Sequence, residues 1–153
     1  MGGRKDEARA QFERALTLRR ALWPVEADDA GSAAVYYCMA CTHPRDEFAH
    51  RARLLERALD IRVRTSGEMH TSTRVTLGDL ATAYAGLGRH ADALAAWLRI
   101  ERIVLHTCDD VNTGRLAWAL DHAALAHDAL GDPASAADAR ARAAALRNAL
   151  ATP

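Results

Sequence analysis

The chain has 153 residues, and its twenty basic side chains balance its twenty acidic ones, so its formal net charge is zero. This balance excludes the overall positive charge that is typical of proteins that bind nucleic acids or anionic membranes. Hydrophobic residues make up 50% of the chain but aromatic residues only 5%, a composition that favours closely packed helices over strands. The polar opening segment and the lack of an apolar run of ~18 residues favour a cytoplasmic protein without membrane spans.

Hydrophobic periodicity predicts an all-α chain of about seven helices, and no segment alternates with period two for long enough to form a strand. The helices are expected, in chain order, at residues 5–22, 28–41, 46–64, 72–87, 90–105, 113–130 and 133–150. Turns are expected at Trp23-Pro24, Pro44, Ser66-Gly67, Gly88, Cys108–Asp110 and Gly131. Asp132 suits the N-cap of the last helix, and Pro133 suits its first position.

One helical block recurs 43 residues further along the chain. The first copy consists of Leu77, Leu80, Ala81, Tyr84, Leu87 and Gly88, and the second of Leu120, Ala123, Ala124, His127, Leu130 and Gly131. The spacing places each block on one face of a helix, and the final Gly can adopt the left-handed conformation that ends it. Phe12 and Ala15 are matched in the same way by Leu55 and Ala58, so the helix at 5–22 corresponds to the second helix of a pair.

The segments Ala58–Arg62, Gly67–His70, Leu77–Tyr84 and Gly88–Ala93 together resemble the tetratricopeptide repeat, in its 42-residue kinesin-light-chain form. The resemblance implies an α-solenoid, in which antiparallel helix pairs stack into a right-handed superhelix. It divides a single array over residues 1–153 into the second helix of repeat 1 at 5–22, a degenerate repeat 2 at 28–64, repeat 3 at 72–105, and repeat 4, which acts as a cap, at 113–150.

The same resemblance implies a non-enzymatic scaffold that binds a peptide or protein segment in a concave groove, with no catalytic residue and no cofactor. The first helix of each pair lines this groove, which places there Tyr36, Tyr37, Gly78, Asp79, Thr82, Asp121, His122 and Leu125. Gly78-Asp79 and Asp121-His122 stand where kinesin light chains have an asparagine pair. Asp79, Asp121 and Asp128 would make the groove mildly acidic, which favours neutral or basic partner segments.

Two alternatives from other classes stay open. Cys38, Cys41, His43 and His50 offer the two thiolates and two imidazoles of a zinc site or a thiol-redox module. Against this, the cysteines fall within a predicted helix, where Cys38 takes the place of the core residue Leu80. The chain is alternatively an accessory part of a larger regulator or enzyme, because its array begins on the second helix of a pair. That uncapped first helix would then also favour self-association.

The aromatic residues and His127 divide between core and groove. Trp97 stands at a consensus core position, and His127 takes the place of Tyr84, so both are expected to pack. For Trp118, a core position and a groove position are both open. Tyr36 and Tyr37 are adjacent on one helix, so only one of them is expected to face the groove.

Overall fold

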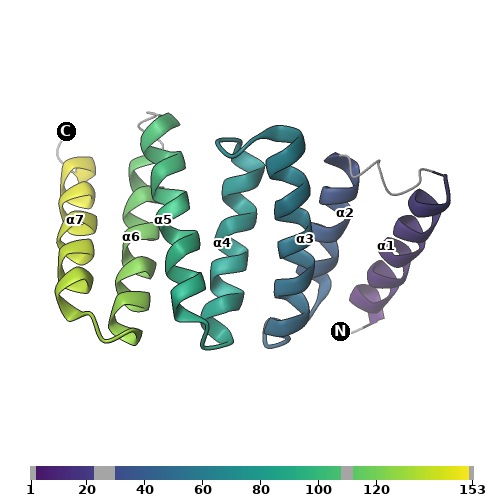
Figure 1. The fold of residues 1–153 in the computed structure, drawn as a ribbon, viewed down its shortest axis with the longest axis horizontal. Helices are drawn as coiled ribbons and strands as arrows, with labels where there is room; N and C mark the ends of the chain where they lie inside the picture. Colours follow the sequence, from purple (N-terminus) through teal and green to yellow (C-terminus); the bar gives the residue numbers. More distant parts are fainter. Residues whose placement is uncertain (1–2, 23–29, 108–111, 152–153) are drawn as a thin grey trace. The chain divides into compact units, whose positions relative to one another are not determined.

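The computed structural model describes residues 3–22, 30–107 and 112–151. Within these ranges the chain forms seven α-helices and no strand (Figure 1), namely α1 (Gly3–Leu22), α2 (Ala30–Thr42), α3 (Phe48–Ser66), α4 (Thr71–Gly86), α5 (His90–Thr107), α6 (Asn112–Ala129) and α7 (Pro133–Ala151). The all-α prediction is confirmed, with helix ends within about two residues of those expected from periodicity. The turns expected at Trp23-Pro24 and Cys108–Asp110 lie outside the described residues.

The helices divide into two compact units, Met1–Thr76 and Leu77–Pro153, with the boundary inside α4. In the first unit α2 packs against both α1 and α3, and in the second α6 packs against both α5 and α7. Each unit therefore contains one helix that lies between two others, as antiparallel pairs in sequence order require. The single array over residues 1–153 and the self-association of its first helix stay predictions. No described helix combines the length and hydropathy that a membrane crossing requires.

The turns after α4 and α6 are built from the same hydrogen bonds, 43 residues apart. The backbone N–H of Arg89 donates to the carbonyl of Tyr84 over 2.9 Å, and that of Asp132 donates to His127 over 2.9 Å. The glycines between them, Gly88 and Gly131, have φ angles of 71° and 76°. Both turns are thus Schellman caps, which confirms the predicted role of the two glycines.

Asp132 then begins α7 as predicted. Its Oδ1 accepts a hydrogen bond from the backbone N–H of Ser135 over 3.1 Å, and Pro133 is the first helical residue. Hydrogen bonds from Ser135 hold the pKa of the Asp132 carboxyl below its ordinary value. A charged cap acceptor of this kind satisfies a backbone donor that the helix itself cannot pair.

The buried face of α2 differs from the sequence-based expectation. The core of the first unit takes Ala33, Tyr36 and Met39 from this helix, whereas Cys38, expected to replace the core residue Leu80, is only partly buried. The α2–α3 connection has five residues and the α4–α5 connection three. The alignment of α2 with α4 is therefore shifted by two residues relative to the alignment of α3 with α5. Tyr36, and not Cys38, therefore takes the core position that Leu80 occupies in the later repeat.

Candidate functional site

A cluster of three aromatic rings lies on the face of α6 that the sequence assigned to a groove. The ring of His122 stacks on that of Trp97 at 4.8 Å and 17°. Trp118 meets both edge-on, at 4.8 Å from Trp97 and 4.6 Å from His122. Trp97 is buried, as predicted, while Trp118 is 47% exposed. We call Trp97, Trp118 and His122 the ring cluster; it holds an exposed indole in one orientation.

Gly78 of α4 lies against the indole of Trp118. A Cβ atom added at Gly78 would lie 3.6 Å from Cη2 of Trp118 and 3.9 Å from Cδ1 of Ile100. These are ordinary contact distances, so an alanine fits here, and any larger side chain reaches the ring. One turn further on, the hydroxyl of Thr82 donates to the carbonyl of Gly78 over 2.9 Å. The absence of a side chain at Gly78 therefore leaves room beside α4 for the indole of Trp118.

The imidazole of His122 is adapted to an apolar setting. Burial lowers its pKa below the ordinary histidine value of 6.5, because desolvation disfavours the charged ring. At neutral pH the ring cluster is consequently uncharged. Leu125, one turn beyond His122, is 57% exposed and extends the apolar surface along the same face of α6.

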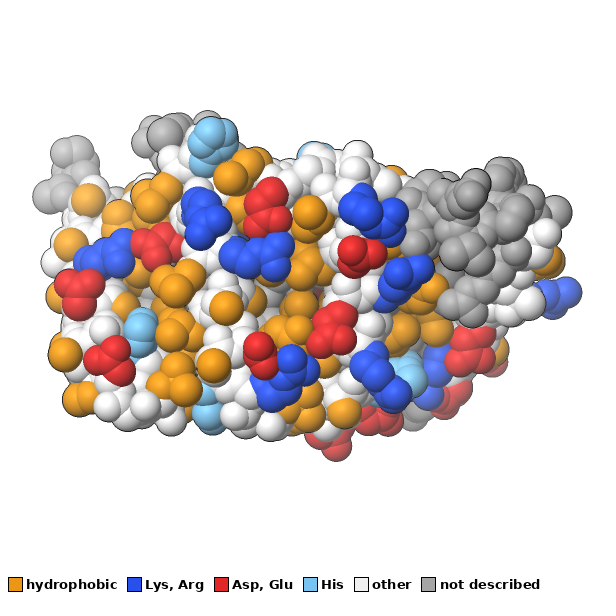
Figure 2. Space-filling model, in the orientation of Figure 1, with side chains coloured by type: hydrophobic (Ala, Val, Ile, Leu, Met, Phe, Trp, Pro, Cys, Tyr) orange, Lys and Arg blue, Asp and Glu red, His pale blue; other side chains and the backbone are white. Residues whose placement is uncertain are grey.

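The acidic character expected of this face is largely offset by α7. Asp121 forms an ion pair with Arg147, and Asp128 forms one with Arg140. Both pairs are exposed to solvent, and such pairs neutralise charge while adding little stability. Figure 2 shows the same interleaving on the face in view, where basic and acidic side chains alternate over α5 and α7. Asp121 and Asp128 are thus both held in ion pairs, which offsets their negative charge.

The two tyrosines of α2 differ in burial. Tyr36 is 8% exposed and belongs to the core of the first unit, which removes its side chain from a ligand-binding surface. Tyr37 is partly buried, and the guanidinium of Arg62 lies 4.6 Å from its ring centroid. Of this pair only Tyr37 lies near the surface.

The cysteine and histidine residues of the metal hypothesis do not form a cluster. His43 Nδ1 lies 2.7 Å from Oε2 of Glu47, and the ring of His43 lies 4.1 Å from that of His50. Cys38 is partly buried and Cys41 is exposed. In the part of the chain that the structure describes, no three Cys, His, Asp or Glu side chains are placed to share a metal ion.

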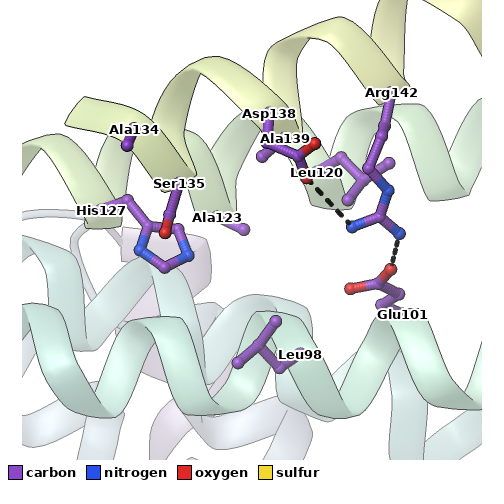
Figure 3. A pocket seen from close by; sticks show the side chains of 10 residues that line it. All are labelled: Leu98, Glu101, Leu120, Ala123, His127, Ala134, Ser135, Asp138, Ala139 and Arg142. Atoms are coloured by element: carbon purple, nitrogen blue, oxygen red, sulfur yellow. Dashed lines mark hydrogen bonds and ion pairs between the residues drawn. The ribbon is translucent and has the colours of Figure 1, made fainter. Parts of the chain in front are cut away.

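A pocket of about 360 Å³ lies between α5, α6 and α7. Figure 3 shows its apolar floor and its two polar ends, lined by Leu98, Glu101, Leu120, Ala123, His127, Ala134, Ser135, Asp138, Ala139 and Arg142. Sequence analysis did not identify it. The available signal was the run of alanines in α7, which leaves space that larger side chains would fill.

Sequence comparisons identify no relative: no family model matches the chain, and no curated protein is similar to it. Solved structures do match in fold, among them the following two. BtubC (BKLC) from P. vanneervenii matches with a TM-score of 0.83 and 20% identity, over 99% of this chain and 59% of BtubC. A kinesin-light-chain-type protein of Podosopora anserina with nearly identical TPR-like repeats matches with a TM-score of 0.61 and 16% identity, over 99% of this chain and 90% of that one. The chain thus spans less than two thirds of BtubC, and its fold is the tetratricopeptide-like fold of kinesin light chains.

Proposed function

We propose that the chain is a non-enzymatic cytoplasmic interaction module that binds a peptide segment on the α4–α6 face of its second unit. The observation that carries the proposal is the half-exposed indole of Trp118, which packs against Trp97 and His122 and lies close to the side of Gly78 that has no side chain. Exposed tryptophans of this kind are frequent binding hot spots. Because the ring is already ordered, little side-chain entropy is lost when a partner binds.

The charge of the surface favours an uncharged partner segment over a basic one. His122 is neutral at neutral pH, since burial lowers its pKa, and the carboxylate of Asp121 is paired with Arg147. Leu125 offers a second apolar contact about two turns from Trp118. A segment that places two apolar side chains on Trp118 and Leu125 would meet no unpaired charge in the ring cluster. Asp79 and Thr82 stay within the proposed surface as polar contacts.

A library of displayed random peptides, selected on the whole chain, tests this function. Substitution Trp118→Ala is expected to weaken the selected peptides about tenfold or more, equivalent to ~1.4 kcal/mol. Leu105→Ala is the matched control, because Leu105 is also a large exposed apolar residue, on α5. Fluorescence titration measures both affinities.

Equal losses in the two variants, or selected peptides that bind both as tightly as the unsubstituted chain, would contradict the proposal. Circular dichroism of each variant separates lost binding from lost folding. Enrichment of no peptide at all also counts against it, since the surface would then lack the affinity that a preordered tryptophan should provide.

A further inference from the structure

The pocket between α5, α6 and α7 is separate from the ring cluster. Leu120, Ala123 and His127 line it from α6, and at 100° per residue they point to the side of the helix opposite Trp118 and Leu125. The pocket therefore offers a second binding surface, on the other side of α6. Its volume of about 360 Å³ falls at the small end of the range for ligand sites, ~300–1,000 Å³.

The side chains that α7 contributes to the pocket are all small or charged. They include Ala134, Ser135 and Ala139, none of which reaches far enough to cover Leu98. As a result Leu98 stays 44% exposed. Figure 3 shows the apolar side chains of Leu98, Leu120 and Ala123 between the two polar ends.

At one end of the pocket, two negatively charged side chains lie beside one positively charged side chain. Arg142 forms an ion pair with Glu101, whose side chain is only 14% exposed. The second carboxylate, Asp138, lies 4.0 Å from Arg142 and its side chain is 72% exposed. Two carboxylates therefore share one guanidinium. An added cation can bind Asp138 while Arg142 keeps Glu101, whereas an added anion would meet excess negative charge.

We propose that this pocket binds one cationic side chain, arginine or lysine, presented by a protein segment. The aliphatic part of that side chain lies on Leu98, Leu120 and Ala139, and its charged end pairs with Asp138. Long basic side chains suit such a site because they carry an apolar stem and a polar head. This inference does not depend on peptide binding at the ring cluster.

Three blocked tripeptides test the inference by ¹H–¹⁵N NMR titration of the whole chain. Acetyl-Ala-Arg-Ala-amide is expected to shift the backbone amides around Leu98 and Ala139. The norleucine analogue keeps the stem without the charge and should bind about threefold to fivefold more weakly, the contribution of one exposed ion pair. The glutamate analogue should cause no shifts at these residues. Equal shifts from the glutamate and arginine peptides would overturn the proposal.

Two substitutions and one control locate the effect. Asp138→Asn removes the exposed carboxylate without disturbing the Glu101 pair and should weaken the arginine peptide about threefold to fivefold, and Ala139→Leu should abolish its binding by filling the pocket. Asp60→Asn removes another exposed carboxylate, in the first unit, and should change nothing. The proposal fails if Asp138→Asn and Asp60→Asn behave alike, or if the shifts map to Trp118 and Leu125. Binding of n-butylguanidinium without binding of the arginine peptide would mean a small free cation, and would also overturn it.

Discussion

The outward faces of α2 and α6 differ, although each helix packs between two others in its own unit. On α6 the largest aromatic side chain, Trp118, is half exposed and supported from below by Trp97. The aromatic side chains of α2 are covered instead, because Tyr36 is in the core and the guanidinium of Arg62 lies over the ring of Tyr37. With the same helix arrangement, the second unit therefore has an exposed aromatic surface on its middle helix, whereas the aromatic side chains on the middle helix of the first unit are covered.

Arg62 is the residue that closes the α2 face. Besides its contact with Tyr37, its guanidinium donates hydrogen bonds to the carbonyl of Ser72, over 2.9 Å, and to the hydroxyl of Thr76. The Thr76 side chain is fully buried and its hydroxyl also donates to the Ser72 carbonyl over 2.8 Å, so the three residues form a hydrogen-bonded network away from water. One arginine therefore joins α2, α3 and the first turns of α4 within the first unit. On α6, by contrast, the arginines of α7 pair with Asp121 and Asp128.

The largest expected effect is on the folded stability of the first unit. Tyr36→Ala removes a ring from the core and should lower the free energy of unfolding by about 3–5 kcal/mol, as other buried aromatic truncations do. Trp118→Ala should cost only about 1–2 kcal/mol, because half of that ring is already in water. Urea unfolding followed by circular dichroism measures both values. Similar losses for the two variants would remove the distinction between a sealed and an open face.

The second largest expected effect is the loss of folded stability when Arg62 is replaced. Arg62→Ala should lower the free energy of unfolding by about 1–3 kcal/mol, since it removes two hydrogen bonds that contribute ~0.5–1.5 kcal/mol each. The Thr76 hydroxyl and the Ser72 carbonyl keep their bond to each other. Arg64→Ala is the matched control, because Arg64 pairs with Asp60 at the exposed surface and such pairs contribute ~0–1 kcal/mol. If both variants lose the same stability, Arg62 does not hold the first unit together.

Most of the fold follows from short-range sequence patterns, which explains the accuracy of the helix prediction. Apolar residues at helical spacing and the terminating Gly88 and Gly131 act within one or two turns of chain. The predicted alignment of α2 with α4 was wrong by two residues, because the α2–α3 connection is two residues longer than the α4–α5 connection. The sequence therefore assigned the core position equivalent to Leu80 to Cys38, whereas Tyr36 occupies it in the structure.

The candidate site was harder to predict because its decisive contacts join distant residues. Trp118 precedes the recurring block, so its placement became evident only from its contacts with Gly78 and Trp97. The pairing of Asp121 with Arg147 spans 26 residues, and no local pattern indicates it. The sequence therefore predicts a set of groove residues, whereas the exposure and net charge of those residues depend on packing between helices.

A smaller effect tests the support beneath Trp118. Gly78→Ala should raise the free energy of unfolding by about 0.5–1 kcal/mol, because glycine is costly within a helix and the new Cβ would lie at an ordinary 3.6 Å from the indole. Gly114→Ala in α6 is the matched control, since nothing lies within 4 Å of its added Cβ. Gly78→Val should shift the fluorescence of Trp118 by displacing the ring. A loss of stability in Gly78→Ala would mean that the ring packs against α4 without room for a methyl group.

The smallest effect is the pH dependence that His122 contributes. Its pKa is lowered in the folded state by burial, so below about pH 6.5 the unfolded chain binds more protons and stability falls as the pH decreases. The loss begins as the pH falls through the unfolded value of 6.5 and is complete below the lowered folded value. His50 acts in the same direction, since burial and the nearby His43 lower its pKa too.

Substitution His122→Phe separates the two histidines, because it keeps a ring on Trp97 but removes the titrating group. Urea midpoints measured at about pH 7.5 and about pH 5.5 should differ less in this variant than in the unsubstituted chain, with His50 accounting for part of the remaining slope. The difference is expected to be small, since a protonated His122 would still be attracted to the face of the Trp97 indole. An unchanged pH slope in His122→Phe would show that the stacked imidazole is not desolvated, and the open face of α6 would then be more polar than its three rings indicate.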